Sequence, residues 1–109
     1  MSAALWPVTT RITAALDAAN GRDEHEIAMR LLKVNEEAGE AAAAYIGATG
    51  QNPRKGRTHS HNDVAQELAD VIVAAAVALL SITDHAPSVL NTKLHEAARR
   101  LQLPPKDPR

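Results

Sequence analysis

The sequence predicts an all-α fold, and two features of its composition support this. Strong helix formers such as alanine, leucine and glutamate dominate the chain, and the apolar–polar alternation typical of β-strands is hard to find. Aromatic residues make up only 2% of the chain, and Phe is absent from it. We therefore expect a helical core built from leucine, isoleucine, valine and closely packed alanine.

The length of 109 residues predicts one domain, which we place at residues 1–103, followed by a disordered C-terminal tail at 104–109. The net charge of −1 gives no indication of binding to nucleic-acid polymers or membrane surfaces. The chain has no Cys, which excludes disulfides and thiolate metal sites. The N-terminus does not resemble a signal peptide, and the longest apolar run, residues 71–82, is too short to span a bilayer. We therefore expect a cytoplasmic protein.

The first two helices are expected at residues 8–20 and 24–48. Trp6-Pro7 should precede the first helix. Gly21 should end it, because glycine tolerates the left-handed conformation that helix ends often need. Asp23 is expected to cap the second helix, since its carboxylate can accept a hydrogen bond from a backbone N–H of the first turn.

The third helix is expected at residues 61–82, with Ser60 and Asp63 in the pattern of a capping box at its start. Residues 71–80 are apolar on every face, so we expect this helix to be buried all round. A domain of this size cannot easily bury a whole helix alone, and the sequence therefore predicts partner subunits. The candidate caps of a fourth helix, which should end near residue 101, are Asp84 and Ser88.

Two pairs of acidic residues are the main candidates for chemistry. Glu37 and Glu40 lie three residues apart on the second expected helix, and Glu67 and Asp70 have the same spacing on the third. This spacing puts both carboxylates of a pair on one helix face. Four carboxylates offer the oxygen ligands that Mg²⁺ prefers, whereas without a cation they repel one another. For Glu67, which lies on an apolar stripe, the alternative is a buried salt bridge to Lys33 or an arginine.

The stretches 33–40 (KVNEEAGE) and 67–71 (ELADV) resemble the EExxE…ExxD signature of the MazG-like, all-α nucleoside triphosphate pyrophosphohydrolases. The resemblance covers roughly residues 27–82. It implies a bundle of four to five helices that assembles as a homodimer or homotetramer, with sites near subunit contacts. It also implies hydrolysis of a nucleoside triphosphate between the α and β phosphates, dependent on Mg²⁺ or Mn²⁺, in one reading for house-cleaning of the nucleotide pool.

The same resemblance assigns roles to residues. Glu37, Glu40, Glu67 and Asp70 would be the Mg²⁺ ligands, and Glu36 would assist or serve a further metal. Either Glu36 or Glu40 could deprotonate the attacking water. Further side chains are needed to hold the phosphates, and the candidates are Lys33, Lys55, Arg57, Asn91 and Lys93.

Three other functions fit part of the pattern. The same site could act on a specialised substrate, such as dUTP or phosphoribosyl-ATP. A carboxylate-bridged di-iron bundle fits less well, because such sites use Glu-x-x-His pairs and no glutamate here has a histidine three residues later. The chain could also be a helical oligomerisation module without catalytic activity, whose acids merely face solvent.

Overall fold

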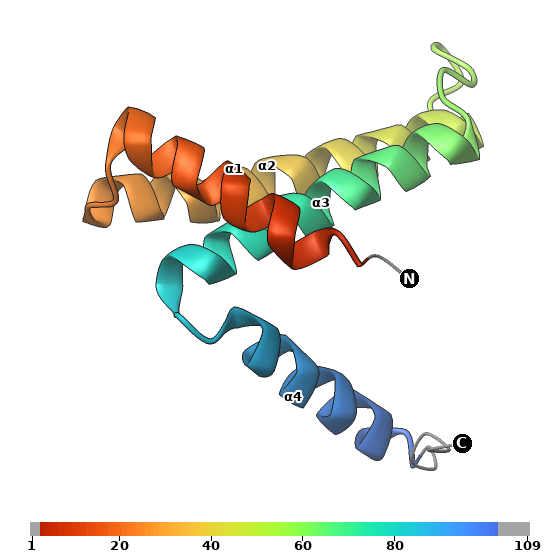
Figure 1. Ribbon diagram of the computed structural model, residues 1–109. Helices are drawn as coiled ribbons and strands as arrows, with labels where there is room; N and C mark the ends of the chain where they lie inside the picture. Colours follow the sequence, from red (N-terminus) through yellow and green to blue (C-terminus); the bar gives the residue numbers. More distant parts are fainter. Residues whose placement is uncertain (1–2, 103–109) are drawn as a thin grey trace.

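The computed structural model describes residues 3–102, which form four helices and no strand (Figure 1). The helices are α1 (Leu5–Asn20), α2 (Glu24–Thr49), α3 (His61–Ile82) and α4 (Ala86–Arg100). The predicted all-α class is therefore confirmed for this part of the chain. The tail expected at 104–109 lies outside the described residues.

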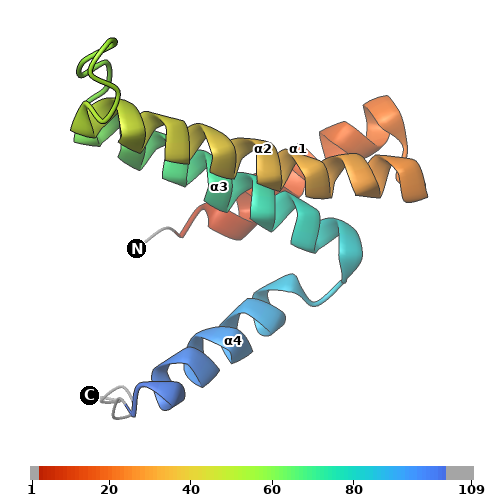
Figure 2. The ribbon, with the colours of Figure 1, turned by 180° about the vertical axis from the view of Figure 1, so that it is seen from behind.

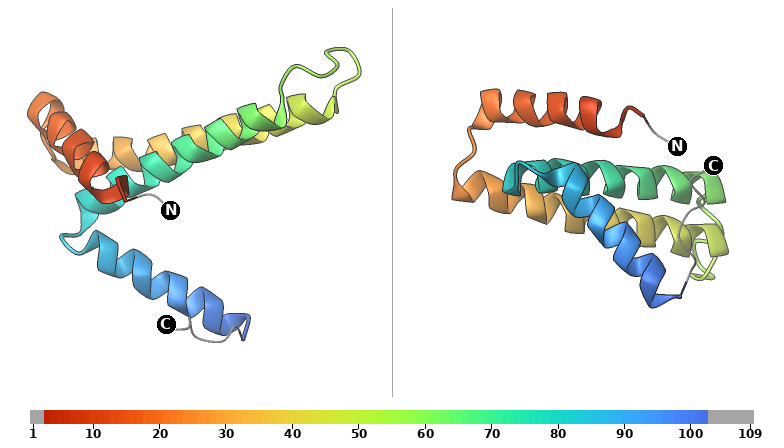
Figure 3. Two further views of the ribbon diagram at one scale, coloured as in Figure 1. Left: turned by 45° about the vertical axis from the view of Figure 1, so that its right-hand side comes forward. Right: turned by 60° about the horizontal axis from the view of Figure 1, so that its bottom comes forward.

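Helix α3 is the centre of the arrangement. It runs side by side with α2 in the opposite direction over most of its length, and α1 packs against it as well (Figures 1 and 2). Helix α4 touches α3 only near the turn between them and then diverges from the other three helices (Figure 3). One chain therefore forms a three-helix body with a projecting arm.

Local capping explains where α2 and α3 begin. The Asp23 carboxylate accepts a hydrogen bond from the Glu26 N–H at 2.9 Å, as expected. Ser60 and Asp63 form the predicted capping box, with reciprocal bonds of 3.1 and 2.8 Å. Gly21 follows α1 with a φ of 75°, which also agrees with the prediction.

Two predictions of helix starts were wrong. Helix α1 begins at Leu5, so Trp6-Pro7 lies inside its first turn; proline is tolerated there because the first backbone N–H groups of a helix have no acceptor within it. Helix α4 begins at Ala86 after His85, without a side-chain cap, so neither Asp84 nor Ser88 has the predicted role. Proline at the second helical position favours this start.

The core of the single chain is small. Within residues 3–102, the buried apolar residues are six alanines and one valine: Ala41, Ala44, Ala48, Ala76, Val77, Ala78 and Ala86. The expectation that α3 is buried on every face is wrong for one chain, because Ile72 is 58% and Val73 39% exposed. The radius of gyration is 17.1 Å, compared with about 13 Å for a compact domain of this length.

Helix α3 has the length and apolar composition of a membrane-spanning helix. By length and composition alone it could cross a bilayer, although the apolar run considered from the sequence was shorter. It carries Glu67 and Asp70, however, and packs against α1 and α2. The central helix of a bundle has the same apolar composition, so length and composition do not distinguish the two.

Candidate metal centre

The antiparallel packing of α2 and α3 brings the two acidic pairs together. Carboxylate oxygens of Glu37, Glu67 and Asp70 lie within 4.8 Å of one another, and so do oxygens of Glu36, Glu37 and Glu40. Glu37 belongs to both groups and thus links them. The five acids predicted from the sequence therefore form one continuous acidic cluster.

Two oxygens of this cluster are buried without a partner. Glu37 is 8% exposed; its Oε1 lies 3.1 Å from Lys33 Nζ, but its buried Oε2 has no hydrogen-bond partner in the described chain. The buried Oε2 of Glu67 has none either. Burying such an atom is costly unless water or a cation satisfies it. Both oxygens belong to carboxylates of the group formed by Glu37, Glu67 and Asp70, where a water or a cation could satisfy them.

The charges of the cluster are only partly neutralised. The Glu40 carboxylate has a raised pKa, chiefly because of the nearby negative charge of Glu37, with desolvation and the charge of Glu67 adding to it. Lys33 lies 2.7 Å from Glu36 and 3.1 Å from Glu37, and these hydrogen bonds raise the pKa of its ammonium group. One lysine thus faces five acids, which leaves an excess of negative charge.

The donor set fits a hard divalent cation. Mg²⁺ binds carboxylate oxygens and usually keeps several waters, so Glu37, Glu67 and Asp70 can hold it with Glu40 nearby. The alternative of a salt bridge between Glu67 and Lys33 is not what the structure contains, because Lys33 pairs with Glu36 and Glu37. Within residues 3–102, no ion pair joins Glu67 to a basic side chain.

A cavity of about 310 Å³ adjoins the cluster. Its walls come from three helices and are mostly apolar, with Glu37 and Asp70 contributing carboxylates. The lining residues are Ile12 and Leu16 of α1, Arg30, Lys33 and Glu37 of α2, and Asp70, Val73, Ala74 and Val77 of α3. A ligand with an apolar part and a metal-binding part would match these two surroundings.

The sequence interpretation missed the cavity walls. Ile12, Leu16 and Arg30 were not among the site residues predicted from the sequence. Arg30 precedes Lys33 by three residues and therefore lies on the same face of α2. A basic residue on the face of the acidic pair was the signal that could have drawn attention to it.

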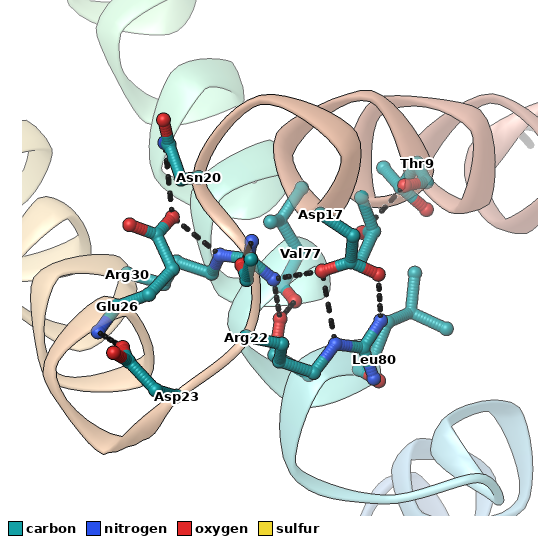
Figure 4. A network of polar contacts seen from close by, with 12 residues as sticks. Thr9, Asp17, Asn20, Arg22, Asp23, Glu26, Arg30, Val77 and Leu80 are labelled. Carbon is teal, nitrogen blue, oxygen red and sulfur yellow. Dashed lines mark hydrogen bonds and ion pairs between the residues drawn. The ribbon is translucent and has the colours of Figure 1, made fainter.

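Arg30 holds the three helices of the body in place (Figure 4). Its side chain is 4% exposed and donates to Asp17 of α1 and Glu26 of α2 at 2.9 Å each. It also donates to Ser81 Oγ of α3 and to the Gly21 carbonyl. Because these bonds use most of its N–H groups, Arg30 acts mainly by positioning the cavity walls.

Asp17 is shared by two arginines in this network. The Arg22 guanidinium, which lies 2.6 Å from the Asp17 carboxylate, lowers the pKa of that carboxyl the most. Desolvation raises this pKa by a smaller amount, and Arg30 lowers it further, so the pKa stays below its usual value. Both pairs link α1 to residues beyond the Gly21 turn (Figure 4). The wall that α1 contributes to the cavity is therefore fixed by ion pairs as well as by packing.

Of the predicted phosphate-binding residues, only Lys33 lies at the acidic cluster. Lys55 and Arg57 are exposed in the loop that joins the C-terminus of α2 to the N-terminus of α3 (Figure 1). Asn91 and Lys93 lie on α4, which diverges from the body, and Lys93 pairs with Glu96 at 3.2 Å. One chain does not bring these four side chains to the cluster.

Comparisons with known proteins identify no relative: no family model, no curated protein and no solved structure matches the chain. The MazG-like resemblance therefore depends on the motif residues alone.

Proposed function

We propose that this protein is a Mg²⁺-dependent nucleoside triphosphate pyrophosphohydrolase, which splits its substrate into a nucleoside monophosphate and pyrophosphate. The observation that carries the proposal is the pair of buried, unpartnered oxygens on Glu37 and Glu67, within a carboxylate cluster that adjoins an apolar cavity. A solvated acidic face has neither the buried oxygens nor the cavity.

In this proposal Glu37, Glu40, Glu67 and Asp70 hold Mg²⁺, and Glu36 supports them. When bound, the cation would neutralise charge on the phosphates and lower the pKa of a bound water. Mn²⁺ can substitute because it also favours carboxylate ligands. Lys33, whose ammonium group already lies at the cluster, holds a phosphate oxygen when substrate displaces part of its pairing with the acids.

The apolar cavity takes the nucleoside. Ile12 and Leu16 on one side and Val73 and Val77 on the other form surfaces against which a flat base can pack. Glu37 and Asp70 at the cavity wall place the phosphates next to the carboxylates. One site thereby meets both chemical parts of a nucleotide.

The general base in this proposal is Glu36 or Glu40, either of which could take the proton of the attacking water. Both belong to the carboxylate group that includes Glu37. Glu36 accepts a 2.7 Å hydrogen bond from Lys33, which substrate phosphate would compete for.

The proposal also includes assembly as a homodimer or homotetramer, a cytoplasmic location and a role in cleaning the nucleotide pool. Lys55, Arg57, Asn91 and Lys93 belong to the site only if a second subunit supplies them. The competing function is an oligomerisation module without catalytic activity. The many exposed apolar side chains support this alternative, because such surfaces are typical of contacts between subunits.

The test is pyrophosphate release from a panel of canonical and modified nucleoside triphosphates, dUTP and phosphoribosyl-ATP included, with Mg²⁺, Mn²⁺ or EDTA. We expect metal-dependent release by the wild type and at least a hundredfold loss in Glu37→Gln. Glu24→Gln, an exposed acid in the first turn of the same helix, is the matched control and should retain activity. Folded protein that releases pyrophosphate from none of these substrates would contradict the proposal.

A further inference from the structure

The loop between α2 and α3 is held against α2 at Gly47. The Thr58 N–H donates to the Gly47 carbonyl at 3.0 Å, and the side chains of Thr58 and His59 fill the space where a Cβ of residue 47 would lie. Glycine is needed for this close approach, because the Cβ of any other residue would push both side chains aside. The position of the His59 ring is therefore set by α2 as well as by the loop.

Gly47 places this ring on the face of α2 that carries the acidic cluster. It follows Glu40 by seven residues, which is almost two helical turns, so the two positions point in nearly the same direction and lie about 10 Å apart along the axis. Ala43 and Ala44, between them on this face, have small side chains. His59 therefore lies beyond the carboxylates, along the same face of the α2–α3 pair.

Three different surroundings follow one another along this face. The cavity is lined by residues toward the start of α2 and the end of α3, such as Arg30 and Val77. The acidic cluster comes next. The loop comes last, because it joins the end of α2 to the start of α3 and the two helices are antiparallel (Figures 1 and 2). The carboxylates thus lie between the apolar cavity and His59.

The loop is positively charged. Residues 51–60 contain Arg54, Lys55 and Arg57 and no acid. No ion pair in the described part of the chain neutralises any of these three side chains. All three are exposed, so they favour an anion through the electrostatic potential around the loop rather than by forming a pocket.

The His59 ring can donate a hydrogen bond to such an anion. Its Nδ1 lies 2.9 Å from the Thr58 hydroxyl. When this hydroxyl donates to Nδ1, the neutral ring carries its hydrogen on Nε2 and is a donor there. The ring is exposed, and the next acid along the chain, Asp63, already accepts a hydrogen bond from the Ser60 N–H at 2.8 Å. A phosphate oxygen is the kind of acceptor that suits this donor.

We propose that His59, positioned by Gly47, binds the terminal phosphate of a nucleoside triphosphate. This inference rests on the proposed function and adds the direction in which the substrate lies. The base occupies the cavity, the α and β phosphates lie at the acidic cluster, and the γ phosphate extends toward the loop. A nucleoside diphosphate has no group that reaches His59, so the site selects triphosphates.

A comparison of triphosphate with diphosphate tests this assignment. The best triphosphate of the panel is the substrate, and the diphosphate of the same nucleoside is measured as a competitive inhibitor. We expect His59→Ala to lower kcat/KM for the triphosphate at least about tenfold, as the loss of a hydrogen bond to a charged group would. The inhibition constant of the diphosphate should change less than about threefold, because no contact to it is lost. Equal losses for both ligands, or none for the triphosphate, would overturn the inference.

Two glycines of α2 offer a matched pair that leaves every charge in place. Gly47→Ala adds a methyl group that collides with Thr58 and His59, whereas the same change at Gly39 meets nothing within 4 Å. Both substitutions favour the helix to a similar extent. Gly47→Ala should therefore lose kcat/KM for the triphosphate as His59→Ala does, while Gly39→Ala should stay within about twofold of wild type. Equal activities of the two glycine variants would contradict the role of Gly47.

Calorimetric titration with inorganic triphosphate in Mg²⁺ separates this inference from the proposed function. A wild type that cleaves no nucleotide contradicts the proposed function alone. Binding of inorganic triphosphate that weakens at least about tenfold in His59→Ala, but not in Gly39→Ala, would still support a phosphate site at the loop. Equal binding by these two variants would overturn the site, whatever the activity of the wild type.

Discussion

Replacing Glu37 by glutamine separates metal binding from fold stability. Without metal, two small effects oppose each other in this variant. Losing the pair with Lys33 costs at most about 1 kcal/mol, because the lysine side chain is 57% exposed. Removing the charge of Glu37 relieves repulsion on Glu40. We therefore expect the metal-free variant to unfold with a free energy close to that of the wild type.

Saturating Mg²⁺ should distinguish the two proteins. A ligand that binds only the folded state stabilises it by about 2.7 kcal/mol at 100 times its dissociation constant. For a domain of this length, this corresponds to a rise of roughly 10 °C in the melting temperature. Because Glu37 belongs to both carboxylate groups, its loss should weaken binding strongly. A hundredfold weaker site would leave only about 0.4 kcal/mol at the same Mg²⁺ concentration.

The assay is thermal unfolding followed by circular dichroism, in EDTA, in Mg²⁺ and in NaCl of matched ionic strength. Glu24→Gln serves as the matched control, since it removes an exposed acid from the same helix, and it should gain as much from Mg²⁺ as the wild type. Two results would refute the reasoning. One is full Mg²⁺ stabilisation of Glu37→Gln, and the other is a wild type that gains no more from Mg²⁺ than from NaCl.

Three further predictions concern pH, the arginine network and a helix cap. The folded-state pKa of Glu40 is raised above 4.5, so the stability linked to its protonation is present below that pH and is lost as the pH rises through the raised pKa. The free energy of unfolding of the metal-free protein, measured in urea from pH 4 to 8, should therefore fall over this range. Glu40→Gln should remove the part of this fall that comes from Glu40. Arg30→Met removes the donor shared by Asp17, Glu26 and the buried Ser81 and should cost about 2 kcal/mol in urea unfolding. Arg11→Met, at an exposed position, should cost little, and equal losses would argue against the network. Ser60→Ala removes the acceptor for the Asp63 N–H and should cost about 1 kcal/mol, so an unchanged urea midpoint would contradict the capping role.

The sequence predicted the local structure of the body well. The bounds of α2 and α3 agree with it to within a residue, and the caps at Asp23 and Ser60 are as expected. Both features depend on hydrogen bonds between residues close in the chain, and such bonds can be predicted from the order of the residues alone. The start of α4 was missed because no side chain caps it.

The gathering of the acids was also within reach of the sequence. Spacing placed each pair on one helix face, and antiparallel packing of neighbouring helices brought the faces together. The sequence did not indicate which acid would be central. That depends on burial, and only packing makes Glu37 8% exposed while Asp70 remains in the exposed class.

What the sequence determined by itself is the helical class, the main helix boundaries and the two acidic faces, since these follow from residue type and short-range spacing. Tertiary structure alone decided that α1 and Arg30 complete a cavity beside the acids, and that α4 leaves the body. It also placed Lys33 against Glu36 and Glu37 rather than against Glu67. These outcomes depend on the angles at which helices meet, which are set by contacts between residues far apart in the chain.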